Sequence, residues 1–117
     1  MAKKSPEGFP KRYRIVHGAE FRAIYNTGRK IQSERFVMFC WENKLSHHRL
    51  GVTVTRKIGG AVTRNRIKRL MREVFRKSCG EIAHHYDLVL NAKSSCLSAC
   101  YWDLREDFLA AVKKAYR

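Results

Sequence analysis

The chain has 117 residues, a length that fits one domain and leaves too little for two. Hydrophobic residues make up 44% of it, which is typical of a folded globular protein and excludes a disordered tail. The chain has 25 Lys and Arg but only 10 Asp and Glu. The resulting net charge of +15 favours a polyanionic partner.

The positive charge is concentrated in one segment. Residues 56–77 contain nine cations and one anion, so they carry more than half of the excess, whereas residues 78–117 are neutral overall. Residues 1–12 contain two prolines and a glycine among charged side chains, which predicts a flexible basic arm. Residues 13–117 are left as the single domain. Such a concentration of cations is typical of a nucleic-acid footprint.

No feature of the sequence indicates a membrane or secretion. No apolar run approaches the ~20 residues of a membrane-spanning helix, and the first ten residues lack the apolar centre of a signal peptide. We therefore expect a cytoplasmic protein with no membrane partner. Its four cysteines are then expected to be reduced: Cys40, Cys79, Cys96 and Cys100.

The spacing of Cys96 and Cys100 would suit a zinc site completed by histidines 47–48 or 84–85. Structural zinc sites usually contain two clear pairs of ligands, and here only one pair of cysteines exists. We expect no metal held by protein residues and interpret both cysteines as small buried thiols.

Helical and strand patterns alternate along the domain. Phe21, Ile24 and Tyr25 fall on one helical face ahead of Gly28, which predicts a short helix over residues 18–27. Apolar patterning predicts three strands and a last helix; the strands are expected over 35–41, 48–55 and 85–92, and the helix over 98–116. With a further helix between the second and third strands, this order indicates an α+β sandwich.

The further helix carries the main charge cluster. It is predicted over 63–77, with Thr63 as its N-cap after the Gly59–Gly60 turn, whose free N–H groups would suit a phosphate. Steps of ~100° per residue place five apolar side chains in one arc: Ile67, Leu70, Met71, Val74 and Phe75. The opposite arc contains Asn65, Lys68, Arg69, Arg72 and Arg76.

A charged outer face is usually no more than solvated surface. In this helix, however, Glu73 is the only acid in a segment of nine cations. Lys68 and Arg72, four residues apart, repel each other. A polyanion would relieve that repulsion, so we expect the basic side of the helix to contact phosphates.

The strand over 35–41 is apolar on both faces, with Phe36, Met38 and Cys40 on one and Phe39 on the other, beside Val37 and Trp41. Taken singly, such aromatic residues are expected in the core. Rings left open beside a basic ridge would instead stack on bases of single-stranded RNA.

Nothing in the sequence identifies a hydrolytic site. The Gly59–Gly60 turn does not match the phosphate-binding loop of nucleotide hydrolases. The acidic residues are few and scattered, which argues against the carboxylate-held metal pair of a protein nuclease.

The segment AVTRNRIKRL at 61–70, preceded by RKIG at 56–59, resembles the RNR signature of the bacterial ribonuclease P protein subunit. Residues 14–28, both central strands and YDLVL at 86–90 resemble that family too, so the similarity covers about residues 12–115. The resemblance implies an αβββαβα two-layer sandwich, similar to a domain of a small-subunit ribosomal protein. It also implies a left-handed βαβ crossover, whereas general physics favours a right-handed one.

The resemblance further implies a function. The protein would bind the catalytic RNA of ribonuclease P and help it remove the 5′ leader from precursor tRNA. Mg²⁺ would act through the RNA, so no protein residue is expected to be catalytic. The residues expected to face RNA are Arg64, Asn65, Arg66, Lys68, Arg69, Arg72 and Arg76. A cleft for the leader would be lined by Phe21, Tyr25 and Phe39, with Arg56 and Lys57 nearby.

Two other classes of protein would also carry a strong positive charge. A ribosomal or other structural RNA-binding protein would have the same charge and fold without a role in cleavage. A DNA-binding regulator could place residues 63–77 in a major groove, but a strand precedes this helix where a helix-turn-helix needs a helix. We therefore expect an RNA partner and no DNA partner.

Overall fold

The computed structural model describes residues 13–43, 45, 47–78 and 85–115. The elements are α1 (Gly18–Thr27), β1 (Arg29–Gln32), β2 (Phe36–Glu42), β3 (Arg49–Thr53), α2 (Ala61–Ser78), β4 (Tyr86–Ala92), the short 3-10 helix η3 (Ser94–Ser98) and α3 (Tyr101–Ala115). The order αβββαβα confirms the expected architecture. The predicted arm over 1–12 lies outside the described residues, as does Cys79.

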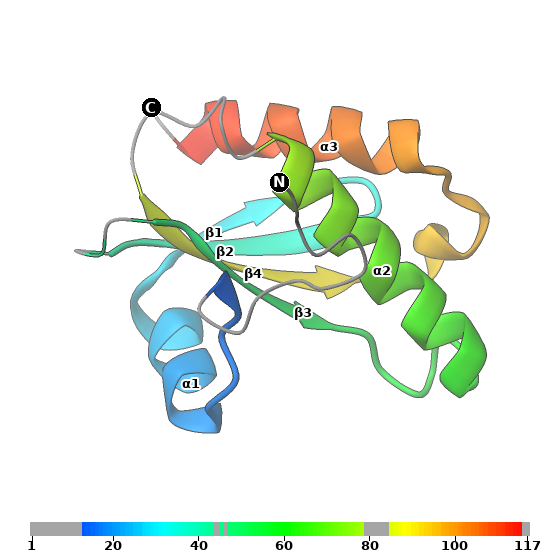
Figure 1. Cartoon of the computed structure of the whole chain (residues 1–117), viewed down its shortest axis with the longest axis horizontal. Helices are drawn as coiled ribbons and strands as arrows, with labels where there is room; N and C mark the ends of the chain where they lie inside the picture. Colours follow the sequence, from blue (N-terminus) through cyan, green and yellow to red (C-terminus); the bar gives the residue numbers. More distant parts are fainter. Residues whose placement is uncertain (1–12, 44, 46, 79–84, 116–117) are drawn as a thin grey trace, which may run out of the picture.

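One mixed sheet organises the molecule, with strand order β1-β2-β4-β3. The β1–β2 and β2–β4 pairs are antiparallel, and β3 is parallel to β4. In Figure 1, β3 and β4 both point to the right, α2 lies in front of the sheet, and β4 lies above β3. The β3–α2–β4 crossover is therefore left-handed, as the resemblance implied.

Two layers of helices cover the sheet unequally. The helices α2 and α3 pack on one face of the sheet and form the main core with it; Phe36 and Met38 of β2 belong to this large apolar cluster. From α2 this core receives Ile67, Met71, Val74 and Phe75, the predicted apolar arc, with Leu70 partly buried beside them. On the other face, α1 buries a small cluster around Ile24 and Val89. The alternation predicted for β2 is thus confirmed.

Gly28 ends α1 because of space and not because of a left-handed backbone conformation. Its φ is −77° and its ψ is 162°, which any residue can adopt. A Cβ at this position, however, would lie 2.7 Å from the Ile24 carbonyl oxygen and 2.9 Å from that of Cys40. The chain turns from α1 into β1 so closely against β2 that only glycine fits.

Three elements differ from the sequence-based expectation. The edge strand β1 was not predicted from the residues, because Arg-Lys-Ile-Gln has one apolar side chain and no visible alternation; pairing with β2 forms it. The Thr63 cap was wrong, since α2 begins at Ala61 and the Arg64 N–H already donates to the Gly60 carbonyl at 2.9 Å.

The last helix also begins later than residue 98. Residues Ser94–Ser98 form η3 as a separate turn. The Asp103 carboxylate accepts the Cys100 N–H at 3.1 Å and closes the start of α3. This hydrogen bond lowers the pKa of Asp103.

The described cysteines are free thiols. Cys40 and Cys96 are buried, and burial raises the pKa of Cys40 to about 12, so its thiol stays protonated. The Cys96 thiol donates to the Arg35 carbonyl at 3.0 Å. Cys100 is exposed, so the expectation of a buried thiol was wrong there; it lies just before α3, outside the apolar side that this helix turns to the core. Within the described ranges, no three His, Cys, Asp or Glu side chains are grouped to hold a metal ion. No helix among these residues is long and apolar enough to cross a membrane.

Gly51 of β3 provides a test of how α1 packs against the sheet through Phe21. A Cβ there would lie 2.7 Å from the Phe21 ring, so Gly51→Ala should push Phe21 outward. We expect a loss of about 1–2 kcal/mol in the free energy of unfolding, as for other overpacked sites, measured by urea denaturation. Gly60→Ala is the control, because nothing lies within 4 Å of its added Cβ. Equal midpoints for the two variants would contradict this packing.

Candidate nucleic-acid interface

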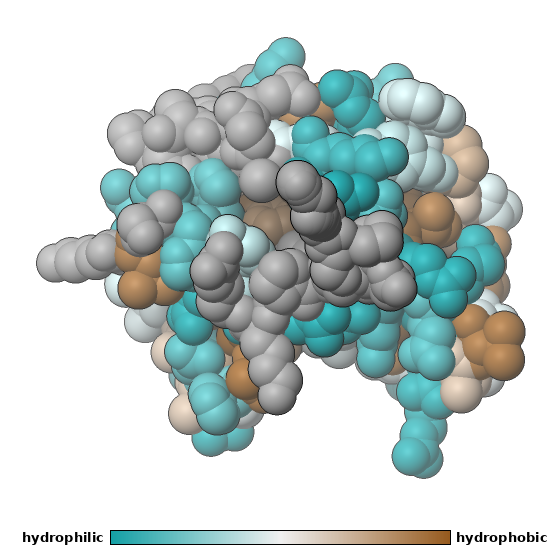
Figure 2. All heavy atoms as spheres, in the orientation of Figure 1, coloured by the Kyte–Doolittle hydropathy of each residue, from teal (hydrophilic) through white to brown (hydrophobic). Residues whose placement is uncertain are grey.

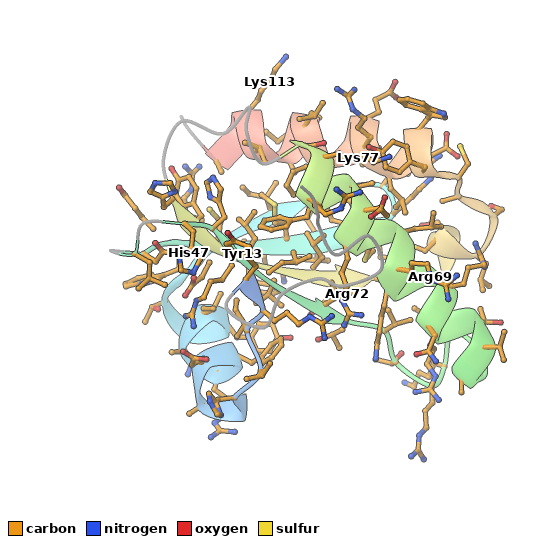
Figure 3. All side chains as sticks on the ribbon, viewed as in Figure 1. Tyr13, His47, Arg69, Arg72, Lys77 and Lys113 are labelled. Atoms are coloured by element: carbon orange, nitrogen blue, oxygen red, sulfur yellow. The ribbon has the colours of Figure 1, made fainter. Side chains whose placement is uncertain are left out.

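The predicted RNA-facing residues of α2 all lie on the outside of the main core, and we call them the basic ridge. They are Arg64, Asn65, Arg66, Lys68, Arg69, Arg72 and Arg76, of which Arg64, Lys68 and Arg72 are half-buried and the others exposed. Figure 3 shows Arg69 and Arg72 on the part of α2 that lies in front of the sheet. Figure 2 shows mainly hydrophilic side chains over this helix, with a hydrophobic patch where it begins. Val62, the second residue of α2, is 85% exposed.

Neighbouring groups hold several ridge side chains in place. The Arg64 Nε donates to the Gly59 carbonyl at 3.1 Å, and the Arg66 guanidinium donates to the Leu97 carbonyl at 3.0 Å. Arg76 makes a two-pronged contact with Glu73, each hydrogen bond being 3.0 Å long. These arginines are therefore oriented before any ligand binds, which reduces the entropy lost on binding.

The rest of the ridge is less compensated. Within the described part of the chain, no carboxylate forms an ion pair with Lys68, Arg69 or Arg72. Burial lowers the pKa of Arg72, and the nearby Arg14 guanidinium lowers it further. Like charges placed this close favour an anionic ligand, because an anion relieves their repulsion.

Three aromatic residues that were predicted to line a cleft meet under α1, on the face of the sheet opposite α2 and α3. The rings of Tyr25 and Phe39 are 4.8 Å apart edge to face, and Phe21 lies 6.4 Å from Tyr25. All three are half-buried against Ile24 and a second isoleucine, Ile15. We call Phe21, Tyr25 and Phe39 the aromatic cluster.

Two polar residues at this cluster were not predicted. The Tyr25 hydroxyl donates to the Asn91 side-chain oxygen at 3.0 Å and lies 3.4 Å from the Thr53 hydroxyl. Asn91 pairs with Thr53 across β3 and β4. Strand alternation places Asn91 on the Val89 side of β4, but only the strand register shows that these groups meet the Tyr25 hydroxyl.

The turn after β3 connects the two surfaces. Arg56 and Lys57 are exposed in this turn, which the Ile58 N–H closes onto the Thr55 carbonyl at 3.1 Å. Thr53 lies two residues before Thr55 beside Tyr25, and Ala61 begins α2 just after the turn. Along the chain, Arg56 and Lys57 thus lie between Thr53, which is beside the aromatic cluster, and Ala61, where the helix of the basic ridge begins.

Comparison with known proteins identifies the family of this chain. The family model described as Ribonuclease P matches residues 9–116. The ribonuclease P protein component of Clostridium kluyveri is 37% identical over 105 residues, which cover 88% of this chain and 94% of the relative. That of Streptococcus pneumoniae is 32% identical over 109 residues, or 92% and 89% of the two chains.

Solved structures are similar over the same range. The Staphylococcus aureus ribonuclease P protein superposes with a TM-score of 0.79 at 33% identity, covering 88% of this chain and 94% of that one. The Thermotoga maritima protein gives a TM-score of 0.79 at 32% identity, covering 86% and 96%. On sequence and fold together, this chain belongs to the ribonuclease P protein family.

Proposed function

We propose that this chain is the protein subunit of ribonuclease P, which binds the catalytic RNA and the 5′ leader of precursor tRNA. The observation that carries the proposal is the continuity between a basic ridge on α2 and an aromatic cluster under α1, through the Arg56–Lys57 turn. Family membership supplies the type of RNA. A protein with this function would work in the cytoplasm, with precursor tRNA.

The two surfaces would bind different parts of RNA. The ridge arginines offer planar forks that match phosphate, and those held by Gly59, Leu97 and Glu73 are already oriented. The aromatic cluster offers rings on which unpaired bases stack with little sequence preference. That tolerance suits an enzyme whose substrates carry different leaders.

In this proposal, the hydrolysis of the phosphodiester belongs to the RNA, with Mg²⁺ bound through that RNA. The protein would contribute by neutralising phosphates, which lets two RNA molecules and their metal ions approach each other. Ridge side chains such as Arg69 and Arg72 would act by charge and position alone.

Reconstitution tests this function directly. The protein, added to a bacterial ribonuclease P RNA at limiting Mg²⁺, should raise the cleavage of precursor tRNA and give no cleavage when the RNA is omitted. Metal-dependent cleavage by the protein alone, lost on substitution of its own residues, would contradict the proposal. Binding to ribosomal RNA in preference to both ribonuclease P RNA and precursor tRNA would favour a structural role instead.

The salt dependence of binding provides a second prediction. If the ridge contacts about six phosphates, log K should fall with log[salt] at a slope of roughly −4 to −5. Arg69→Ala should make this slope shallower by nearly one unit, because Arg69 forms no ion pair among the described residues. Arg76→Ala should change the slope less, because Glu73 already compensates part of that charge. Filter binding at several salt concentrations measures both, and an unchanged slope for Arg69→Ala would identify the ridge as solvated surface.

A further inference from the structure

Two aromatic rings, those of Tyr101 and Trp102, lie at the start of α3, far in the sequence from the aromatic cluster. Trp102 is 69% exposed, the highest value of any aromatic side chain in the described residues. Its ring stands edge to face with Tyr101, with 5.0 Å between the ring centres. The Lys77 ammonium, from the end of α2, lies 5.4 Å from the centre of the Tyr101 ring. Figure 3 shows Lys77 at the upper end of α2, next to α3.

The core does not explain why Trp102 is a tryptophan. The helix α3 packs Leu104 and Phe108 into the main core, and Trp102 points away from that side. Tyr101 is partly buried against the same core, so it provides a fixed wall behind the indole. An exposed indole on a fixed support has its large flat surface available to a partner.

This surface continues from the basic ridge. The Arg66 guanidinium donates to the carbonyl of Leu97 in η3, and Leu97 is itself 46% exposed. Around the axis of α2, at ~100° per residue, Lys77 lies near Arg66 and more than about 100° from Arg72. Lys77 therefore contacts Tyr101, at the beginning of α3, from the side of α2 that carries Arg66. Trp102 therefore lies along the flank of α2 opposite the one that carries Arg72.

The acidic groups nearby are mostly engaged. Asp103 accepts the Cys100 N–H, Asp107 binds Arg35 at 2.9 Å, and Glu73 pairs with both Arg76 and Lys77. Glu106, one turn after Trp102, is exposed. In a chain of net charge +15, this setting favours a polyanionic partner over a neutral peptide surface, and a nucleic acid is the polyanion whose flat bases can stack on an exposed indole.

We propose that Trp102, supported by Tyr101 and Lys77, is a second base-stacking site that takes an unpaired base of the catalytic RNA. The inference rests on the proposed function and adds a contact beyond the RNR signature and the aromatic cluster. The catalytic RNA is favoured over the leader because Trp102 and Arg72 lie on opposite flanks of α2. Arg14 is near Arg72, and Ile15, the next residue, packs with the aromatic cluster, so a leader that reaches this cluster would approach along the flank of Arg72.

Tryptophan fluorescence can test the contact without altering the site. The chain has two tryptophans, so Trp41→Phe leaves Trp102 as the only one, and Trp102→Phe leaves Trp41. Titration of the Trp41→Phe protein with ribonuclease P RNA should quench Trp102 and protect it from acrylamide. The same titration of the Trp102→Phe protein reports what Trp41 contributes.

Affinity is the second readout. Trp102→Ala should weaken binding to ribonuclease P RNA by about five- to tenfold, while Trp102→Phe should keep most of the affinity because it keeps a ring. The salt slope should stay unchanged, since stacking releases no counterions. Lys113→Ala is the matched control, an exposed residue near the other end of α3. Thermal unfolding of each variant checks that the fold is retained.

The outcomes separate the two proposals. A wild-type protein that neither binds nor activates ribonuclease P RNA would overturn the proposed function itself. If the wild-type protein does both, but Trp102 fluorescence and the affinity of Trp102→Ala are unchanged, the stacking site alone is wrong. Quenching by precursor tRNA but not by ribonuclease P RNA would overturn the assignment to the catalytic RNA. Protection of Trp102 from acrylamide in the free protein would show that another part of the chain covers it.

Discussion

Replacing Asp87 with alanine should lower the free energy of unfolding by about 3 kcal/mol, as expected when one partner of a buried ion pair is removed. Asp87 is 5% exposed at the start of β4. Its carboxylate accepts hydrogen bonds from the Arg49 Nε at 2.9 Å, the Arg49 Nη2 at 2.6 Å and the Asn43 side-chain amide at 2.8 Å. Without it, the Arg49 guanidinium, 19% exposed, would keep Glu20, at 3.0 Å, as its one ion-pair partner among the residues that the structure describes.

Glu20 provides the matched control within the same network. Its side chain is 35% exposed, against 7% for Asp87, so water already screens its attraction to Arg49. Glu20→Gln should therefore cost less than about 1 kcal/mol. Urea denaturation followed by circular dichroism measures both variants. Equal losses, or a loss below about 1 kcal/mol for Asp87→Ala, would show that the Arg49–Asp87 contact contributes little.

The hydrogen bonds that Arg49 donates to Asp87 also stabilise the charged form of Arg49 and raise its pKa. This pair connects β3 and β4, which are parallel neighbours with α2 between them in the sequence. It therefore helps fix the register that sets Thr53 beside Asn91. A loss of this contact would disturb the sheet under the aromatic cluster as well as the stability of the whole domain.

Periodicity in the sequence was enough to predict most elements but not all of them. The bounds of α1 match the predicted 18–27 because three apolar residues share one face and Gly28 follows them. The strand β1 has no such signal, since only Ile31 of its four residues is buried. Short edge strands of this kind form by pairing with a neighbour, and pairing is a property of the tertiary structure.

Contacts between residues far apart in the sequence were harder to predict than the elements themselves. The sequence placed Phe21 and Tyr25 on one helical face and Phe39 on a strand face, and the structure brings all three together. Their polar partners could not be predicted in the same way. The contact from Tyr25 to Asn91 spans 66 positions and depends on the packing of α1 against a particular register of β4. The left-handed crossover likewise came from family resemblance and not from general physics.

Phe39 is where the proposed leader contact can be tested most directly. Mature tRNA differs from its precursor by lacking the leader, so a preference for the precursor must come from contacts with that single strand. Phe39→Ala in the reconstituted enzyme should weaken binding of precursor tRNA several-fold, because stacking contributes ~1–3 kcal/mol per base. Binding of mature tRNA should be nearly unchanged. Equilibrium binding of both RNAs to the same enzyme measures the difference.

The half-buried position of Phe39 makes its controls important. Its ring packs against Tyr25, so truncation to alanine removes part of the small cluster under α1 as well as the stacking surface. Phe39→Leu fills much of that space without an aromatic face, and it should lose the same preference for the precursor while remaining folded. Phe36→Ala, on the same strand but in the main core, should instead destabilise the domain and affect both tRNAs alike. If Phe39→Leu keeps the wild-type preference, or if Phe39→Ala weakens both tRNAs equally, Phe39 is core packing and the leader binds elsewhere.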